Sequence, residues 1–201
     1  MTRTLRVLSL AVLFALGLAS GTALAQAGSA ARTAATDTQA SYPEGETALG
    51  WTYLHPTDGG PNSELGGALA AAYNLTPWVG IAFDGSVNHF SGQIADTAGW
   101  GQTEYALLGG FRFALRQSGM VVPFAHLLAG YGRINIDYAG SSSGDDYFVI
   151  QPGGGVDVGS GKFGARVEVS WRRMFYQSGG FNRMRVFAGL VVRSGPKHPA
   201  F

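Results

Sequence analysis

Large apolar residues and small or polar residues alternate with a period of two along most of the chain after residue 44. From Val79 to Val87 the odd positions are mostly large and apolar, and the even positions carry Gly, Ala, Asp and Ser. Successive side chains of a β-strand point to opposite faces, so this segment predicts a strand with one large apolar face and one small polar face.

The same alternation recurs and predicts eight strands in total. They lie near residues 48–53, 64–73, 79–89, 104–113, 121–138, 148–158, 166–175 and 184–193. The fifth segment fits least well, because the polar positions Arg133, Asn135 and Asp137 would place His126 among the apolar set. We therefore expect a β-bulge that changes the facing partway along this strand.

The composition of the small face indicates which side meets water. It carries Gly, Ala and Ser with isolated charges, and the only two lysines, Lys162 and Lys197, fall outside the predicted strands. A water-facing surface normally mixes many charged side chains, whereas the interior of a narrow barrel has room only for small ones. The large face is therefore predicted to meet lipid. A soluble lipocalin-like barrel, with the two faces inverted, remains an alternative.

The predicted connections alternate in length. Those near 75–77, 116–120 and 159–163 are short, and those near 55–63, 91–102, 139–146 and 177–182 are mostly longer. This alternation is typical of barrels with short periplasmic turns and long outer loops. Lipid offers no partner to an open strand edge, so the sheet must close. The sequence predicts an all-β fold, an eight-stranded antiparallel up-and-down transmembrane β-barrel.

The first 25 residues have the pattern of a secretory signal peptide. Arg3 and Arg6 precede the apolar run from Val7 to Leu18, and Ala23-Leu24-Ala25 supplies the small residues of a cleavage site. The apolar run is shorter than the roughly 20 residues of a spanning helix. We expect a cleaved signal peptide (1–25), a flexible leader (26–43), a barrel (44–195) and a short tail (196–201). The expected location is the outer membrane of a Gram-negative bacterium.

Composition narrows the function further. Glycine supplies 31 of the 201 residues, about double the share of about 7% in average proteins. Only 13% of the residues are charged, about half the usual share. The absence of cysteine excludes disulfide scaffolds, thiolate metal sites and cysteine nucleophiles. A net charge of +1 provides no footprint for nucleic acid.

Four stretches resemble the outer membrane protein β-barrel domain family, whose barrel is similar to the transmembrane domain of outer-membrane protein A. They are Glu46-Thr47-Ala48-Leu49-Gly50-Trp51-Thr52-Tyr53-Leu54, Tyr73-Asn74-Leu75-Thr76-Pro77-Trp78-Val79-Gly80, Val122-Pro123-Phe124-Ala125-His126 and Gly153-Gly154-Gly155-Val156-Asp157. The resemblance covers residues 44–195 and rests on turns, glycines and aromatic anchors. It implies a barrel without a catalytic signature, which the outer-membrane assembly machinery would insert.

The small face predicts a network of charges in the lumen. Its members are Glu64, Asp84, Glu104, Asp137, Asp157, Glu168, Arg112, Arg133, Arg166, Arg172, Arg185 and Arg193. A buried unpaired charge is strongly unfavourable, and arginine pairs carboxylates through its planar fork. We expect these groups to fill the lumen as salt bridges. A gated ion path, which would make the protein a narrow channel, is the alternative.

Aromatic residues at the strand ends predict two girdles at the lipid interfaces. The expected interface set is Trp51, Tyr53, Tyr73, Trp78, Phe90, Phe124, Tyr138, Phe148, Trp171, Arg173 and Phe175. Arg173 lies on the lipid-facing side late in its strand, which predicts a position at the outer interface. There it could contact a lipopolysaccharide phosphate.

One pair of residues allows an enzymatic alternative. His89 and Ser91 share a face near the outer leaflet, and a histidine base beside a serine nucleophile is a hydrolase arrangement. The pair is similar to the His-x-Ser of eight-stranded lipid A deacylases, although Gly92 follows where that family has Asn. His126 and His198 have no companion at metal-ligand spacing, and the glycines form no nucleotide fingerprint. We expect a monomeric, non-enzymatic barrel with no cofactor or metal, acting in envelope structure or surface interaction.

Overall fold

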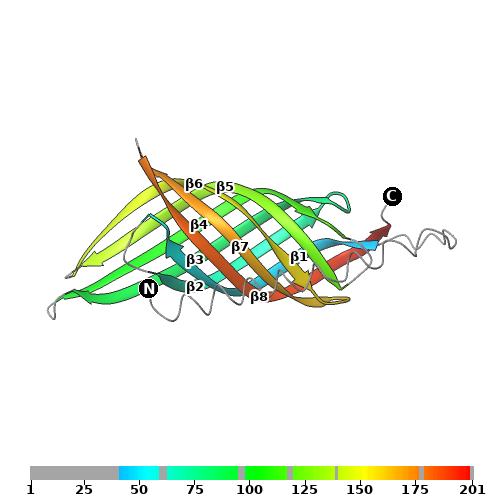
Figure 1. The fold of residues 1–201 in the computed structure, drawn as a ribbon, viewed down its shortest axis with the longest axis horizontal. Coiled ribbons are helices and arrows are strands. Elements are labelled where there is room, and N and C mark those ends of the chain that lie inside the picture. Colours follow the sequence, from blue (N-terminus) through cyan, green and yellow to red (C-terminus); the bar gives the residue numbers. More distant parts are fainter. Residues whose placement is uncertain are drawn as a thin grey trace. The chain divides into compact units, whose positions relative to one another are not determined.

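The computed structural model describes residues 41–58, 63–94, 98–116, 120–138, 140–176 and 179–199. They form one closed antiparallel barrel in which each strand pairs with its neighbours in the sequence and the last strand pairs with the first (Figure 1). The strands are β1 (Ser41–Pro56), β2 (Glu64–Asn74), β3 (Val79–Ile94), β4 (Ala98–Ala114), β5 (Val121–Tyr138), β6 (Ser141–Val158), β7 (Phe163–Tyr176) and β8 (Gly179–Pro199). The predicted fold class is confirmed. The described residues contain no helix long and apolar enough to cross a membrane.

The outward face of the barrel carries a continuous apolar band. Trp51 is 79% exposed and Leu107 is 66% exposed, and every strand contributes similar outward residues. On β5 the band runs from Val121 to Tyr131, and on β6 from Phe148 to Val158. This length matches the roughly 9–11 residues with which a tilted strand crosses the hydrocarbon core. Apolar side chains stay on the outside because lipid, unlike water, does not penalise them.

The strands are longer than this band, and the expected long loops at one end are wrong. Most of the residues predicted as loops near 91–102, 139–146 and 177–182 belong to strands instead. In β5 and β6 the pairing continues to Tyr138↔Ser141, about 20 Å beyond the band at the usual rise per residue. Figure 1 shows the β3–β4 and β5–β6 hairpins projecting together from this end, which we call the mouth.

The bulge expected in β5 is also absent. The β4–β5 pairing runs without a shift from Trp100↔Tyr138 to Ala114↔Phe124, and the β5–β6 pairing is equally regular. His126 therefore points inward, and Arg133 points outward. What changes along the strand is its surroundings: the outward face passes from lipid into water beyond Tyr131, so polar residues there become favourable.

The strands β1 and β8 extend a few residues past the expected barrel limits. Backbone pairs join Ser41–Pro43 of β1 to Lys197–Pro199 of β8, which corrects the predicted barrel limits of 44 and 195. The register shifts by one residue between Pro43 and Gly45. Gly195 lies at this bulge with a φ of 84°, a conformation that costs other residues about 1–2 kcal/mol. The bulge is what lets the strands continue past prolines. Residues 1–40, with the expected signal peptide, and Phe201 lie outside the described residues.

Candidate functional site

The inward face of the barrel holds a set of buried charged side chains. They are the acids Glu46, Glu64, Asp84, Glu104, Asp157 and Glu168 and the arginines Arg112, Arg166, Arg172, Arg183 and Arg185. Each occupies a position of the small face, where the neighbouring Ala, Gly and Ser residues leave room for a long side chain. They form three layers along the barrel.

The layer nearest the mouth joins two glutamates to two arginines. Arg183 Nη1 donates to Glu64 Oε1 at 2.6 Å, and Arg183 Nε lies 2.9 Å from Glu104 Oε2. Arg172 Nη1 donates to Glu104 Oε1 at 2.7 Å, and its Nε donates to Gln151 Oε1 at 2.8 Å. The two guanidinium groups thus share Glu104 between them.

The middle layer is centred on Arg185. Its Nη2 donates to Asp84 Oδ2 at 2.9 Å, and its Nη1 donates to Glu168 Oε1 at 3.0 Å. Arg172 Nη2 lies 3.9 Å from Asp84 Oδ1 and so connects this layer to the one above. His126 Nε2 lies 3.8 Å from Glu168 Oε1, too far for a hydrogen bond.

The third layer lies toward the end with the short turns. Arg112 bridges Glu46 and Asp157, and Arg166 Nε donates to Asp157 Oδ1 at 2.7 Å. The Phe124 ring packs against both guanidinium groups, with centroid distances of 4.2 Å to Arg112 and 4.8 Å to Arg166. These cation–π contacts place an aromatic side chain inside the polar lumen.

Side chains fill the lumen between these layers. A gap of about 10 Å³ beside His126 and Asp84 has only the volume of a single water molecule. An eight-stranded barrel has an interior that side chains can just fill. The ion pairs thus block the lumen across its width, because each arginine reaches from its own strand to carboxylates on other strands.

Three of the predicted lumen residues lie elsewhere. Arg133 and Asp137 are on the outward face of β5, where Arg133 Nη1 donates to Asp146 Oδ1 at 3.1 Å. The regular register of β5 is the reason. Arg193 is on the inward side of β8 but hydrogen-bonds the carbonyl oxygens of the 159–163 turn, not a carboxylate. The other nine, Glu64, Asp84, Glu104, Asp157, Glu168, Arg112, Arg166, Arg172 and Arg185, are buried in the lumen.

Sequence reasoning missed two central members of the network. Glu46 shares the face of Ala48 and Thr52, and Arg183 shares the face of Arg185. Extending the alternation by one step at each strand end would have found both. Arg116, in the turn after β4, also reaches Glu46 Oε1 at 2.6 Å, and no strand periodicity could have indicated it.

Whether a predicted interface residue points outward or inward depends largely on its position along the barrel axis. Those that point outward are Trp51, Tyr53, Tyr73, Trp78, Phe148, Trp171, Arg173 and Phe175. Three are corrected: Phe124 is buried in the lumen, and Phe90 and Tyr138 lie on the inward side of β3 and β5 beyond the band. Beyond the band the outside is water, so aromatic residues there gain more by facing inward.

Arg173 lies at the edge of the band nearest the mouth. Its Nη1 donates to Asn182 Oδ1 at 3.1 Å, and its guanidinium lies 5.2 Å from the Phe175 ring centroid. The indole of Trp171 donates to the same Asn182 oxygen at 3.2 Å. These contacts hold the charge at the boundary, and a contact with a lipopolysaccharide phosphate stays a prediction.

The candidate hydrolase pair is not joined by a hydrogen bond in the structure. His89 Nδ1 pairs with Thr103 Oγ1 on β4 at 2.9 Å, directly across the strand pair. His89 and Ser91 are both exposed on the outward face of β3. Among the described residues no group of three His, Cys, Asp or Glu side chains could hold a metal ion.

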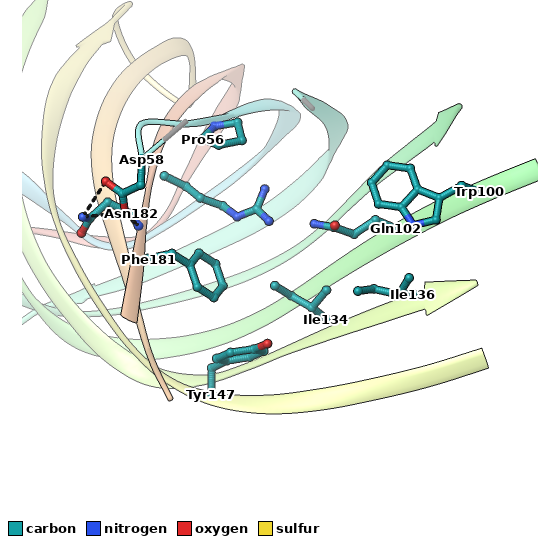
Figure 2. Close-up of a pocket in the computed structure, with 10 residues that line it drawn as sticks. Pro56, Asp58, Trp100, Gln102, Ile134, Ile136, Tyr147, Phe181 and Asn182 are labelled. Atoms are coloured by element: carbon teal, nitrogen blue, oxygen red, sulfur yellow. Dashed lines mark hydrogen bonds between the residues drawn. The ribbon is translucent and has the colours of Figure 1, made fainter. Parts of the chain in front are cut away.

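A cavity of about 390 Å³ opens at the mouth, above the first layer of ion pairs. Figure 2 shows Trp100 on one side and Phe181 on the other, with Ile134 and Ile136 between them. Tyr147 packs edge-on against Phe181 at 5.3 Å. Polar groups complete the lining, namely Asp58, Gln102, Asn182 and Arg183, together with Pro56.

Two features of the cavity rim concern its polar groups, Asp58 and Tyr147. Asp58 accepts hydrogen bonds from the backbone and side-chain nitrogens of Asn182, drawn as dashes in Figure 2. Burial, with Asp145 and Tyr176 nearby, raises the pKa of the Tyr147 phenol above its ordinary value. The phenol therefore remains a neutral hydroxyl at physiological pH.

Comparison with solved structures identifies the same architecture. Neisserial surface protein A aligns with a TM-score of 0.58 at 12% identity, covering 75% of this chain and 96% of that one. The attachment invasion locus protein Ail of Yersinia pestis aligns at 0.50 and 15% identity, covering 74% and 98%. Its complex with the heparin analogue sucrose octasulfate aligns at 0.50 and 17%, covering 74% and 99%. The fold is that of the small eight-stranded membrane barrels, as the sequence motifs indicated. No protein-family model and no curated protein matches the chain.

Proposed function

We propose that this protein is a monomeric integral barrel of a Gram-negative outer membrane that carries a rigid sheet outside the cell for contact with surfaces or ligands. Lipid would surround its apolar band. The observation that carries the proposal is the extension of four adjacent strands beyond that band, above a lumen filled with ion pairs. The extension comprises 90–94 of β3, 98–103 of β4, 133–138 of β5 and 141–147 of β6, and we call it the wall.

The outward surface of the wall is polar and suited to contact with water. Its outward face carries polar residues such as Arg133, Asn135 and Asp146, with Arg133 Nε donating to Asn135 Oδ1 at 2.9 Å. Within the described residues, β6 pairs with β7 only from Phe148 inward, and β3 pairs with β2 only from His89 inward. In the part of the chain that the structure describes, the wall thus has two edges without a strand partner, and such edges are surfaces suited to contact with other molecules.

The names of the similar structures support a surface role. One is named a surface protein, and the other is named the attachment invasion locus protein and was crystallised in complex with a heparin analogue. The acids of this wall, Asp137, Asp145 and Asp146, outnumber Arg133, so its charge does not favour a polyanion such as heparin. We therefore propose a surface location for this chain, but we do not propose heparin as its ligand.

Cysteine labelling tests the orientation, because the chain has no cysteine of its own. Asn135→Cys, on the outward side of the wall, should react fully with a membrane-impermeant maleimide on intact cells. Ser160→Cys, in the exposed turn after β6, is the matched control and should react only after the cells are opened. Labelling of Ser160→Cys but not of Asn135→Cys on intact cells would reverse the orientation, and equal labelling of both would argue against a spanning barrel.

The ion-pair layers also predict that the barrel does not conduct ions. In planar bilayers the purified protein should produce no large stable channels, because Arg172, Arg185 and Arg112 each cross the lumen to a carboxylate. A matched recording of a water-filled porin in the same bilayer confirms that channels would be detected. Stable openings from the folded protein would favour the narrow-channel alternative.

A further inference from the structure

The mouth cavity combines apolar ring surfaces with a polar floor. Trp100 is braced by Phe90, with ring centroids 5.3 Å apart, and Phe181 is braced by Tyr147 at the same distance. Its volume of about 390 Å³ lies at the small end of the range for ligand pockets, about 300–1,000 Å³. Rings held in this way form flat walls for a compact ligand.

The floor offers hydrogen-bonding groups that the protein itself leaves partly unused. Arg183 is buried, and two of its three nitrogens are engaged below the floor, Nη1 with Glu64 Oε1 and Nε with Glu104 Oε2. Gln102 lines the cavity, and its amide nitrogen donates a hydrogen bond to Glu64 Oε1 at 2.7 Å. Within the described residues, no hydrogen bond is made by Arg183 Nη2 or accepted by the Gln102 amide oxygen. A donor and an acceptor therefore stand side by side on the cavity floor.

Charge at the cavity disfavours ions of either sign. A cation would approach Arg183, whose guanidinium lies 5.4 Å from the Phe181 ring centroid and so occupies one aromatic face. An anion would approach Asp58 at the rim and Glu64 and Glu104 below the floor. The suitable ligand is uncharged, has an apolar face for the rings, and carries both donors and acceptors.

We propose that the mouth cavity binds one uncharged sugar ring of a glycan. The C–H face of a pyranose would stack on Trp100, and its hydroxyls would bond Arg183 and Gln102. Aromatic side chains suit such a ligand because they provide apolar area at a small cost in side-chain entropy. The proposal rests on the proposed function in one respect, that the mouth faces the outside of the cell.

The test uses the full barrel folded into phosphatidylcholine nanodiscs, with empty nanodiscs as blank. The probes are the methyl glycosides of glucose, galactose, mannose and N-acetylglucosamine, followed by ligand-observed saturation-transfer NMR and titration. At least one should bind saturably with a Kd on the order of 1 mM or tighter. Trp100→Ala should weaken that binding at least about tenfold through loss of stacking. Ile136→Trp should abolish it by filling the cavity.

Trp78→Ala is the matched control, since Trp78 lies in the turn between β2 and β3 at the opposite end of the barrel, and it should bind as the parent does. Sucrose octasulfate and choline serve as anionic and cationic probes and should bind more weakly than the best neutral glycoside. Heat-modifiable gel mobility checks that each variant is folded, and Ile136→Trp decides the outcome if Trp100→Ala does not fold.

Three results would each overturn the sugar proposal. They are no saturation by any neutral glycoside below about 50 mM, tighter binding of a charged probe, and unchanged binding by both cavity variants. Because binding in nanodiscs does not depend on orientation in the cell, these failures are separate from a failure of the labelling experiment.

Discussion

Replacement of Arg172 by leucine is expected to lower the free energy of unfolding by about 3–5 kcal/mol, the range for breaking a buried ion pair. Arg172 is 0% exposed and donates hydrogen bonds to Glu104, Gln151 and Ser86. Leucine would leave a buried carboxylate with one arginine fewer, in a lumen that water barely enters. Urea unfolding of the protein in lipid vesicles, followed by tryptophan fluorescence, measures the change.

The adjacent residue provides the control for this variant. Arg173 points outward at the edge of the band and makes only exposed contacts, so Arg173→Leu should change the same free energy by about 0–1 kcal/mol. The double variant Arg172→Leu with Glu104→Gln should recover part of the loss, because the charge left behind is removed as well. If the two leucine variants have equal stability, the lumen network does not stabilise the barrel.

A charge placed on the outward band should cause the second largest loss in the free energy of unfolding. Leu127→Arg lies at the middle of the band on β5, where the residue is 54% exposed in the structure. At the bilayer midplane an outward arginine costs about 2–4 kcal/mol. The unfolding measurement in vesicles should show this loss, with the same slope against urea concentration.

Ser142→Arg provides the contrast, on the outward side of β6 within the wall and directly opposite Asp137. Water surrounds this position, so the arginine should cost less than about 1 kcal/mol. The comparison also tests whether lipid covers the band, since both arginines would be solvated if the outward face met water along its whole length. Equal stabilities for the two variants would contradict the position of the band.

The alternation of the sequence was sufficient to predict the barrel and most of its lumen. A strand must send neighbouring side chains to opposite faces, so Glu104 and Tyr105, or Arg172 and Trp171, separate in any sheet that contains them. The same pattern applied one step further along two strands would have included Glu46 and Arg183. This part of the structure depends on local geometry alone.

The predicted bulge in β5 shows where local geometry was insufficient. Arg133, Asn135 and Asp137 share a face with Leu127, and a single strand gives no sign of where lipid ends and water begins. Only the pairing with β4 and β6, regular to Tyr138↔Ser141, showed that the strand leaves the band without changing its facing. Phe90 and Tyr138 were misplaced for the same reason, because both lie beyond the band.

By itself the sequence determined the number of strands, the two faces of each and the chemistry of the lumen, since these follow from periodicity and side-chain size. The tertiary structure decided which carboxylate each arginine reaches, how far the wall stands out of the band, and that Trp100, Tyr147 and Phe181 meet around one cavity. Those relations join residues far apart in the chain. They depend on the stagger of neighbouring strands around the closed barrel, a quantity that no single segment encodes.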